Sequence, residues 1–112
     1  MSSPIEFLPE GSVTTPLGFT AAAAHAGLKS GGALDVALLV SATSCGTAGV
    51  FTRNTVRAAP VLYDEALLRE RPGRVRAVAM NARVANACTG ADGLAAARAM
   101  AQAAEQAAGL PP

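Results

Sequence analysis

Glycine and proline divide the apolar part of this chain into short runs, which favours several short helices and strands over any long uninterrupted element. The 112 residues include 11 glycines and 7 prolines. No run reaches the roughly 18 apolar residues that a membrane span requires, and the N-terminus lacks the basic and apolar regions of a signal peptide. The length is close to that of one domain. We therefore expect one folded domain in the cytoplasm, without a membrane partner.

Composition narrows the class of protein further. Apolar residues make up 51% of the chain and charged residues 15%, which is typical of a folded core and not of a disordered tail. The net charge is +1 and the arginines are scattered, so nothing indicates nucleic-acid binding. Cys45 and Cys88 are the only cysteines and His25 is the only histidine, which excludes a disulfide framework and the common zinc motifs. We predict no metal and no nucleic-acid partner.

The first half of the chain predicts an extended lead-in followed by a β-hairpin. Residues 1–17 carry prolines, serines and threonines without a period, which predicts a lead-in with a short strand near Val13–Thr15. Gly31-Gly32 is a turn signal, and the apolar run Val36–Val40 beyond it is typical of a buried strand. The alanine-rich run Ala21–Leu28 favours helix by propensity. A hairpin across the two glycines is nevertheless the preferred interpretation.

The second half predicts further strands and a short helix. Thr47–Thr52 and Ala59–Tyr63 are short apolar segments that predict two strands, with Pro60 at a strand start. Asp64 is placed to cap a short helix, and Val75–Met80 predicts another strand. The predicted secondary structure thus changes along the chain from a β-meander to a strand-helix-strand unit.

A long alanine-rich helix is predicted at the end of the chain. Thr89 and Asp92 have the spacing of a capping box, and the helix is expected to run to about Ala108, where Gly109 stops it. Its polar side chains form one narrow stripe, so the rest of its surface should lie against a sheet. The mixed order of elements indicates an α/β (α+β) domain. Because the chain ends on Pro112 soon after this helix, we expect more polypeptide to follow.

Two residues could carry chemistry, and each has a simpler structural interpretation. Cys88 precedes a helix N-terminus, where the dipole can lower a thiol pKa, but free cysteine is more often a small buried apolar residue. His25 is the one imidazole that could assist it, although an isolated histidine is more often structural. The backbone N–H groups of Asn86–Gly90 could face an anion, but an ordinary capped loop is the simpler interpretation. A Cys88/His25 enzyme and a non-catalytic assembly or interaction module remain as alternative functions.

Four segments, in order and spacing, carry a resemblance to a known family. They are Gly18-Phe19 leading into the alanine-rich stretch, Ala48–Asn54, Ala58–Val61, and Asn81–Gly90, which ends in Ala-Asn-Ala-Cys-Thr-Gly. With these segments the chain resembles the N-terminal part of the α chain of ornithine acetyltransferases, the bifunctional glutamate N-acetyltransferases of arginine biosynthesis. Arg83 and Val84 depart from the family, which usually has glycine and a further asparagine there.

The resemblance implies an αββα-type layered sandwich, of which residues 18–112 would form the N-terminal part. It implies a precursor that cleaves itself into α and β chains and frees an N-terminal threonine. That threonine would take the acetyl group of N-acetylornithine and pass it to glutamate through an acyl-enzyme. The implied partners are the remainder of the α chain and the β chain, as an (αβ)2 hetero-oligomer in the cytoplasm. No cofactor is implied, and acetyl-CoA is a further acetyl donor that the whole enzyme could use.

The resemblance assigns no catalytic residue to this chain. The family's oxyanion turn and nucleophilic threonine correspond to positions beyond Pro112. Asn81, Asn86, Thr89 and Gly90 match the family's loop and are the candidates for residues near the site. We therefore expect these 112 residues to be scaffold and to be inactive alone.

Overall fold

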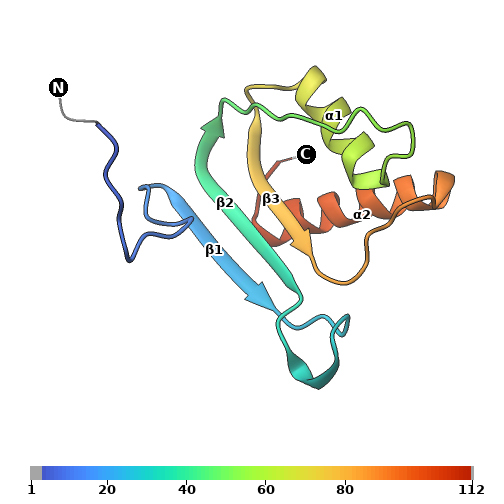
Figure 1. Cartoon of the computed structure of the whole chain (residues 1–112), viewed down its shortest axis with the longest axis horizontal. Coiled ribbons are helices and arrows are strands. Elements are labelled where there is room, and N and C mark those ends of the chain that lie inside the picture. The colour runs from blue at the N-terminus through green and yellow to red at the C-terminus, as the bar shows by residue number, and fades with distance from the viewer. Residues whose placement is uncertain (1–3, 112) are drawn as a thin grey trace.

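The computed structural model describes residues 4–111. The first three residues of the predicted lead-in, and Pro112 at the end of the predicted domain, lie outside this range. The elements are β1 (Phe19–Ala24), the short 3-10 helix η1 (Ser30–Gly32), β2 (Val36–Cys45), α1 (Ala59–Glu70), β3 (Val75–Asn81) and α2 (Gly90–Ala107). They form one three-stranded sheet and two α-helices, so the predicted mixed α/β class is confirmed (Figure 1).

The sheet is antiparallel throughout and has the order β1-β2-β3. Ala22 lies opposite Leu38 of β2, and Leu38 lies opposite Ala79 of β3. The predicted hairpin across Gly31-Gly32 is confirmed. The alanine-rich run before it is not a helix, since Ala21–Ala24 belong to β1 and residues 25–28 lie in the hairpin loop. Alanine's helix propensity is a weak local preference, and it is overridden here because pairing with the longer β2 satisfies the backbone of β1.

The side chain of Arg76 bonds to the backbone where the pairing of β2 with β3 is irregular. The register shifts between Val40 and Cys45. The Arg76 side chain on β3 donates from Nε to the Ser41 carbonyl at 2.9 Å and from a terminal nitrogen to the Ala42 carbonyl at 3.0 Å. These bonds satisfy carbonyl groups of the shifted segment, so the strand continues past the irregularity to Cys45.

Several predicted elements are wrong. Thr47–Thr52 is irregular, Ala59–Tyr63 belongs to α1, and the segment around Val13–Thr15 forms turns. Ala59–Tyr63 can be helical because Pro60 lies in the first turn of α1. In that turn the fixed φ of proline is suitable and its missing N–H costs nothing. Asp64 is accordingly inside the helix, and Ala58 is at the N-cap.

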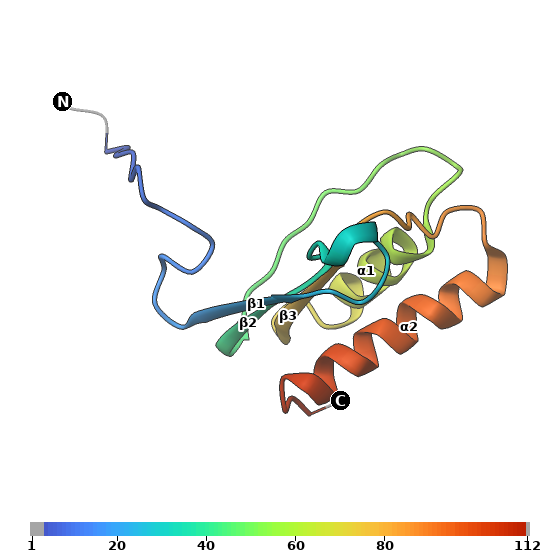
Figure 2. The ribbon, with the colours of Figure 1, turned by 90° about the horizontal axis from the view of Figure 1, so that it is seen from below.

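The predicted strand at Val75–Met80 and the predicted terminal helix are confirmed. Both α-helices lie on one side of the sheet, where α1 packs against α2 and α2 contacts β3 (Figure 2). The opposite face of the sheet is open, and on it Val78 is 49% exposed and Met80 is 45% exposed. A shallow depression of about 390 Å³ covers this face, and it is lined by residues of all three strands together with Val13. The chain thus forms one helix layer and one sheet, in line with part of an αββα sandwich.

Candidate functional site

All four candidate residues lie between the end of β3 and the start of α2. Asn81 is the last residue of β3 and Gly90 is the first of α2. The Asn81 amide donates from Nδ2 to the Val84 carbonyl at 2.9 Å, so it fixes the course of the chain as it leaves the sheet. Asn81 therefore contributes to the shape of the loop through its own hydrogen bond.

Asn86 joins the starts of both α-helices. Its Nδ2 donates to the Gly93 carbonyl at 2.9 Å, and its Oδ1 accepts from the Thr89 hydroxyl at 2.6 Å. Its backbone carbonyl accepts from the Ala59 N–H at 3.0 Å, at the first residue of α1. Asn86 and Thr89 are thus in contact, as neighbours in one network, whereas Asn81 lies at the other end of the loop.

The predicted capping box is wrong. Thr89 is at the N-cap of α2, but its side chain makes no capping bond to the helix. Its φ of −106° and ψ of 1° differ from the extended conformation in which an N-cap hydroxyl reaches the helix N–H groups. The hydroxyl bonds to Asn86 instead.

The backbone of this segment has a positive φ at four positions. Arg83, Asn86 and Cys88 have φ values of 72°, 48° and 58°, and Gly90 has a φ of 60°. This left-handed conformation costs a residue with a Cβ roughly 1–2 kcal/mol, and asparagine tolerates it best. Arg83 is the position where the resemblance expects glycine, so the departure from the family falls on a backbone that favours glycine.

Arg83→Gly is expected to raise the free energy of unfolding by about 0.5–1 kcal/mol, because relief of the left-handed strain exceeds the added freedom of the unfolded chain. Urea denaturation measures the change. Arg53 is the matched control, since it is an exposed arginine outside the positive-φ positions. Arg53→Gly should leave stability unchanged or lower it slightly. An equal gain from both substitutions would mean that the φ of Arg83 is not the cause.

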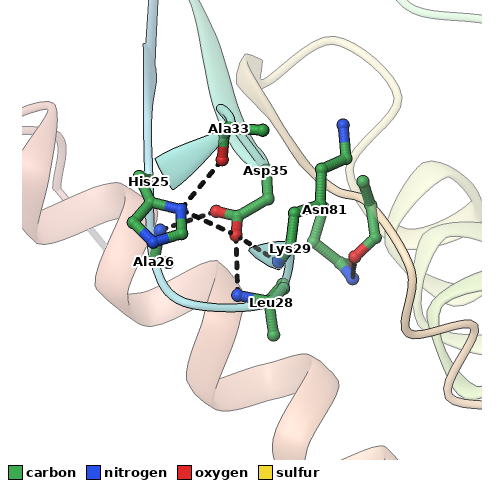
Figure 3. A network of polar contacts seen from close by, with 8 residues as sticks. His25, Ala26, Leu28, Lys29, Ala33, Asp35 and Asn81 are labelled. Atoms are coloured by element: carbon green, nitrogen blue, oxygen red, sulfur yellow. Dashed lines mark hydrogen bonds and ion pairs between the residues drawn. The ribbon is translucent and has the colours of Figure 1, made fainter. Parts of the chain in front are cut away.

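A second polar cluster surrounds Asp35, at the end of the sheet where β3 leaves for the loop (Figure 3). Asp35 is only 4% exposed. Its Oδ1 accepts from the Ala26 N–H at 2.6 Å, and its Oδ2 accepts from the N–H groups of Leu28 at 2.6 Å and Lys29 at 2.8 Å. These backbone donors, first that of Ala26, hold the pKa of the Asp35 carboxyl below its usual value.

His25 completes the Asp35 cluster. Its Nδ1 is 2.8 Å from the Ala33 carbonyl and 3.3 Å from Asp35 Oδ2. Because both of these oxygens can only accept, Nδ1 is the nitrogen that carries the proton. Asp35 was not singled out from the sequence. The available signal was an acidic residue placed between a Gly-Gly turn and a buried apolar run, where a carboxylate can accept from turn N–H groups.

The Asp35 cluster is structural in its chemistry. Both carboxylate oxygens already accept short hydrogen bonds from the backbone, so the group is poorly placed to take a proton from a substrate. A depression of about 240 Å³ beside it is lined by Asp35, Asn81 and mostly apolar neighbours. The cluster's clear role is to fix the hairpin loop between β1 and β2 against the end of the sheet.

The structure does not support a catalytic pair of Cys88 and His25. Cys88 is exposed in the loop that precedes α2, and His25 directly follows β1 and is engaged with Ala33 and Asp35. The end of β1 and the start of α2 lie apart in both ribbon views (Figures 1 and 2). Within residues 4–111, no group of three or more His, Cys, Asp or Glu side chains could hold a metal ion. In the same range, no helix is long and apolar enough to cross a membrane.

Comparisons with known proteins identify the family. The model of the ArgJ family matches residues 20–112. The arginine biosynthesis bifunctional protein ArgJ of Mycobacterium tuberculosis H37Rv is 51% identical over 92 residues, which cover 81% of this chain and 22% of that protein. The ArgJ protein of Symbiobacterium thermophilum is 47% identical over 104 residues, covering 91% of this chain and 25% of the relative. The chain thus spans about a quarter of the length of these curated relatives.

Solved structures agree with the sequence match. The crystal structure of the ArgJ protein of Bacillus halodurans has a TM-score of 0.83 at 34% identity, covering 90% of this chain and 52% of that chain. Ornithine acetyltransferase of M. tuberculosis, complexed with ornithine, has a TM-score of 0.76 at 49% identity, covering 82% of this chain and 47% of that chain. The fold and the sequence match the same proteins, and the chain belongs to the ArgJ family, in which it corresponds to an N-terminal portion.

Proposed function

We propose that this chain is the N-terminal scaffold of an acetyltransferase of arginine biosynthesis that moves an acetyl group from N-acetylornithine to glutamate. The observation that carries the proposal is the ArgJ family match over residues 20–112. The ornithine bound to the M. tuberculosis relative supports it, because ornithine is what remains when N-acetylornithine gives up its acetyl group. The compartment consistent with this pathway role is the cytoplasm.

The proposed partners are the remainder of the α chain and the β chain of one precursor, as an (αβ)2 assembly. Two observations support this. The same region covers 22% of the curated M. tuberculosis protein but 47% of the crystallised chain, as expected if the crystallised polypeptide is one piece of a cleaved precursor. The open sheet face with Val78 and Met80 also requires a covering layer, because contiguous exposed apolar surface is unfavourable in water.

The chemistry is proposed to belong to other residues of that assembly. The nucleophilic threonine and the oxyanion turn correspond to positions beyond Pro112, and no cofactor is required for acyl transfer of this kind. Acetyl-CoA would be a second acetyl donor if the whole enzyme is bifunctional. The loop from Asn81 to Gly90 is proposed to lie near the site, where its dense hydrogen bonding would hold a wall of the substrate pocket rigid.

Acetyl transfer tests the proposal directly. The 112-residue chain and the whole ArgJ protein that contains it are each mixed with N-acetylornithine and glutamate, and N-acetylglutamate is quantified by mass spectrometry. We expect turnover by the whole protein only, with N-acetylornithine slowing hydrogen exchange in the Asn81–Gly90 loop. Turnover by the chain alone would contradict the scaffold role. Absence of turnover by the whole protein would contradict the activity.

The second candidate function is a non-catalytic assembly module, which the uncovered sheet face also favours. Intact mass spectrometry of the native complex distinguishes the two. A threonine-initiated second chain that accompanies this one supports the acetyltransferase. Its absence, together with a complex built from this chain and unrelated proteins, supports the assembly module.

A further inference from the structure

The loop between β3 and α2 is held at two separate places. Its first half is held by the sheet, where the Ala82 N–H donates to the backbone carbonyl of Asp35 at 2.8 Å. Its second half is held by Asn86, whose side chain bonds to Gly93 and Thr89 and whose carbonyl accepts from the first residue of α1. Loss of the Asn86 side chain therefore releases the second half of the loop and leaves the first half in place.

The chain between Asn86 and α2 has no other backbone attachment. Among the described residues, neither Ala87 nor Cys88 makes a backbone hydrogen bond. The Thr89 hydroxyl bonds back to Asn86 and not forward to the N–H groups of α2. The positions of these three residues are thus set by Asn86 at one end and by the first turn of α2 at the other.

Gly93 shows how closely the Asn86 side chain fits against α2. A Cβ at Gly93 would lie 2.6 Å from Asn86 Oδ1, which leaves no room for a side chain. Glycine is disfavoured relative to alanine inside a helix, so α2 gives up helix propensity where Asn86 approaches it. Asn86 is half-buried and has a φ of 48°, which asparagine tolerates better than most residues. Its backbone and its side chain are both fitted to this position.

We propose that Asn86 is a positioning residue for acetyl transfer. Its amide ties residues 87–90 to the first turn of α2, and this segment is the part of the substrate-pocket wall that depends on it. The inference rests on the proposed function, in which the loop borders the substrate pocket. Asn86 acts through the loop and not on a reacting group, since its amide oxygen and nitrogen are engaged with Thr89 and Gly93.

A role in positioning has a kinetic signature that differs from a role in folding. In an acyl-enzyme mechanism one pocket receives N-acetylornithine and then glutamate, so a displaced wall weakens the binding of both substrates. Loss of binding raises KM and leaves kcat nearly unchanged, whereas loss of folded protein lowers kcat and leaves KM unchanged. The two constants therefore separate the two roles.

Steady-state kinetics of Asn86→Gly in the whole ArgJ protein test the proposal. Glycine retains the left-handed backbone and the carbonyl that accepts from α1, and it removes only the amide. We expect the KM values of N-acetylornithine and glutamate to rise about tenfold each, with kcat within about threefold of the parent. Asn54→Gly is the matched control, because it removes an amide that accepts from the Val56 N–H in an exposed turn, and it should leave KM unchanged. Parental KM values for Asn86→Gly, or a fall in kcat alone, overturn the proposal.

Thr89→Val keeps the test decisive if Asn86→Gly does not fold. The substitution removes the hydroxyl that donates to Asn86 Oδ1 and retains a β-branched side chain, and α2 loses no capping bond. We expect both KM values to rise about threefold, since one of the two side-chain bonds of Asn86 is lost. Thr89→Ser retains the hydroxyl and should show the parental values. Parental KM values for Thr89→Val would then overturn the proposal.

The affinity for ornithine gives a measurement that needs no turnover. Calorimetry should give a Kd about tenfold higher for Asn86→Gly than for the parent or for Asn54→Gly. If the parent binds ornithine but transfers no acetyl group, the proposed function fails, and these affinities still decide whether Asn86 positions the loop. Equal affinities for all three proteins would contradict the positioning role and leave the proposed function intact.

Discussion

Gly93→Ala is expected to lower the free energy of unfolding by about 2–3 kcal/mol, through overpacking. Gly93 is buried in the first turns of α2. A Cβ there would lie 1.7 Å from the Thr89 hydroxyl oxygen and 2.6 Å from Asn86 Oδ1. Helix propensity alone predicts the opposite sign, since alanine is favoured over glycine in a helix by roughly 1 kcal/mol. The sign of the change therefore tests whether the loop packs against α2 as described.

Urea denaturation of Gly93→Ala and of Gly46→Ala provides the comparison. Gly46 is exposed, and a Cβ there would meet nothing within 4 Å, so its substitution should change stability by no more than about 0.5 kcal/mol. Thr89→Gly removes two of the three closest atoms and should recover part of the loss when combined with Gly93→Ala. A Gly93→Ala protein as stable as the parent would show that Asn86 and Thr89 do not occupy these positions.

The parts of the fold that the sequence predicts correctly are those decided by local signals. Val75–Met80 lies between a Pro-Gly turn and an asparagine, and the terminal helix combines alanine with a glycine stop. The hairpin was predicted from its glycine turn. The alanine-rich strand β1 needed more than its own residues, because its conformation depends on the backbone partners that β2 supplies.

The start of α1 shows why a short apolar run is ambiguous. Ala59–Tyr63 has the composition of a strand, and proline is compatible both with an edge strand and with a first helical turn. In the structure the segment is the start of α1, and the Ala59 N–H donates to the Asn86 carbonyl, which joins residues far apart in the sequence. The pattern of residues within the segment cannot predict a contact of this kind.

The candidate loop was located by resemblance, but its physical basis needed the structure. The family's glycine at position 83 corresponds to a left-handed backbone, and Arg83 adopts the same φ at a cost. The role of Asn86 as a link between two helices depends on contacts to Ala59 and Gly93. The role of Asp35 was not predicted, because the N–H groups that bond to its carboxylate come from a turn whose shape no single sequence motif indicates.

Asp35→Asn is expected to be nearly as destabilising as Asp35→Ala, and more so than substitution of any exposed carboxylate in this chain. A carboxylate only accepts hydrogen bonds, and both of its oxygens accept from backbone N–H groups here, at Ala26 on one side and at Leu28 and Lys29 on the other. Asparagine replaces one oxygen with an NH₂ group, so a donor would face a buried donor. Chemical denaturation at pH 7 measures the loss. Asp92→Asn is the matched control, because Asp92 is exposed in the first turn of α2.

The pH dependence of stability distinguishes the hydrogen-bonded carboxylate of Asp35 from a side chain that contributes only packing. The backbone donors lower the pKa of folded Asp35 below its usual value of 3.8, so the unfolded state binds the proton more readily. The stabilisation is therefore fully present above about pH 4 to 5 and is lost as pH falls through the lowered pKa of the folded state. The stability difference between the parent chain and Asp35→Ala should shrink between pH 6 and pH 3, whereas the difference for Gly93→Ala should stay constant. A difference for Asp35→Ala that does not change with pH would mean that the carboxylate charge contributes nothing and that the turn is held by its other contacts.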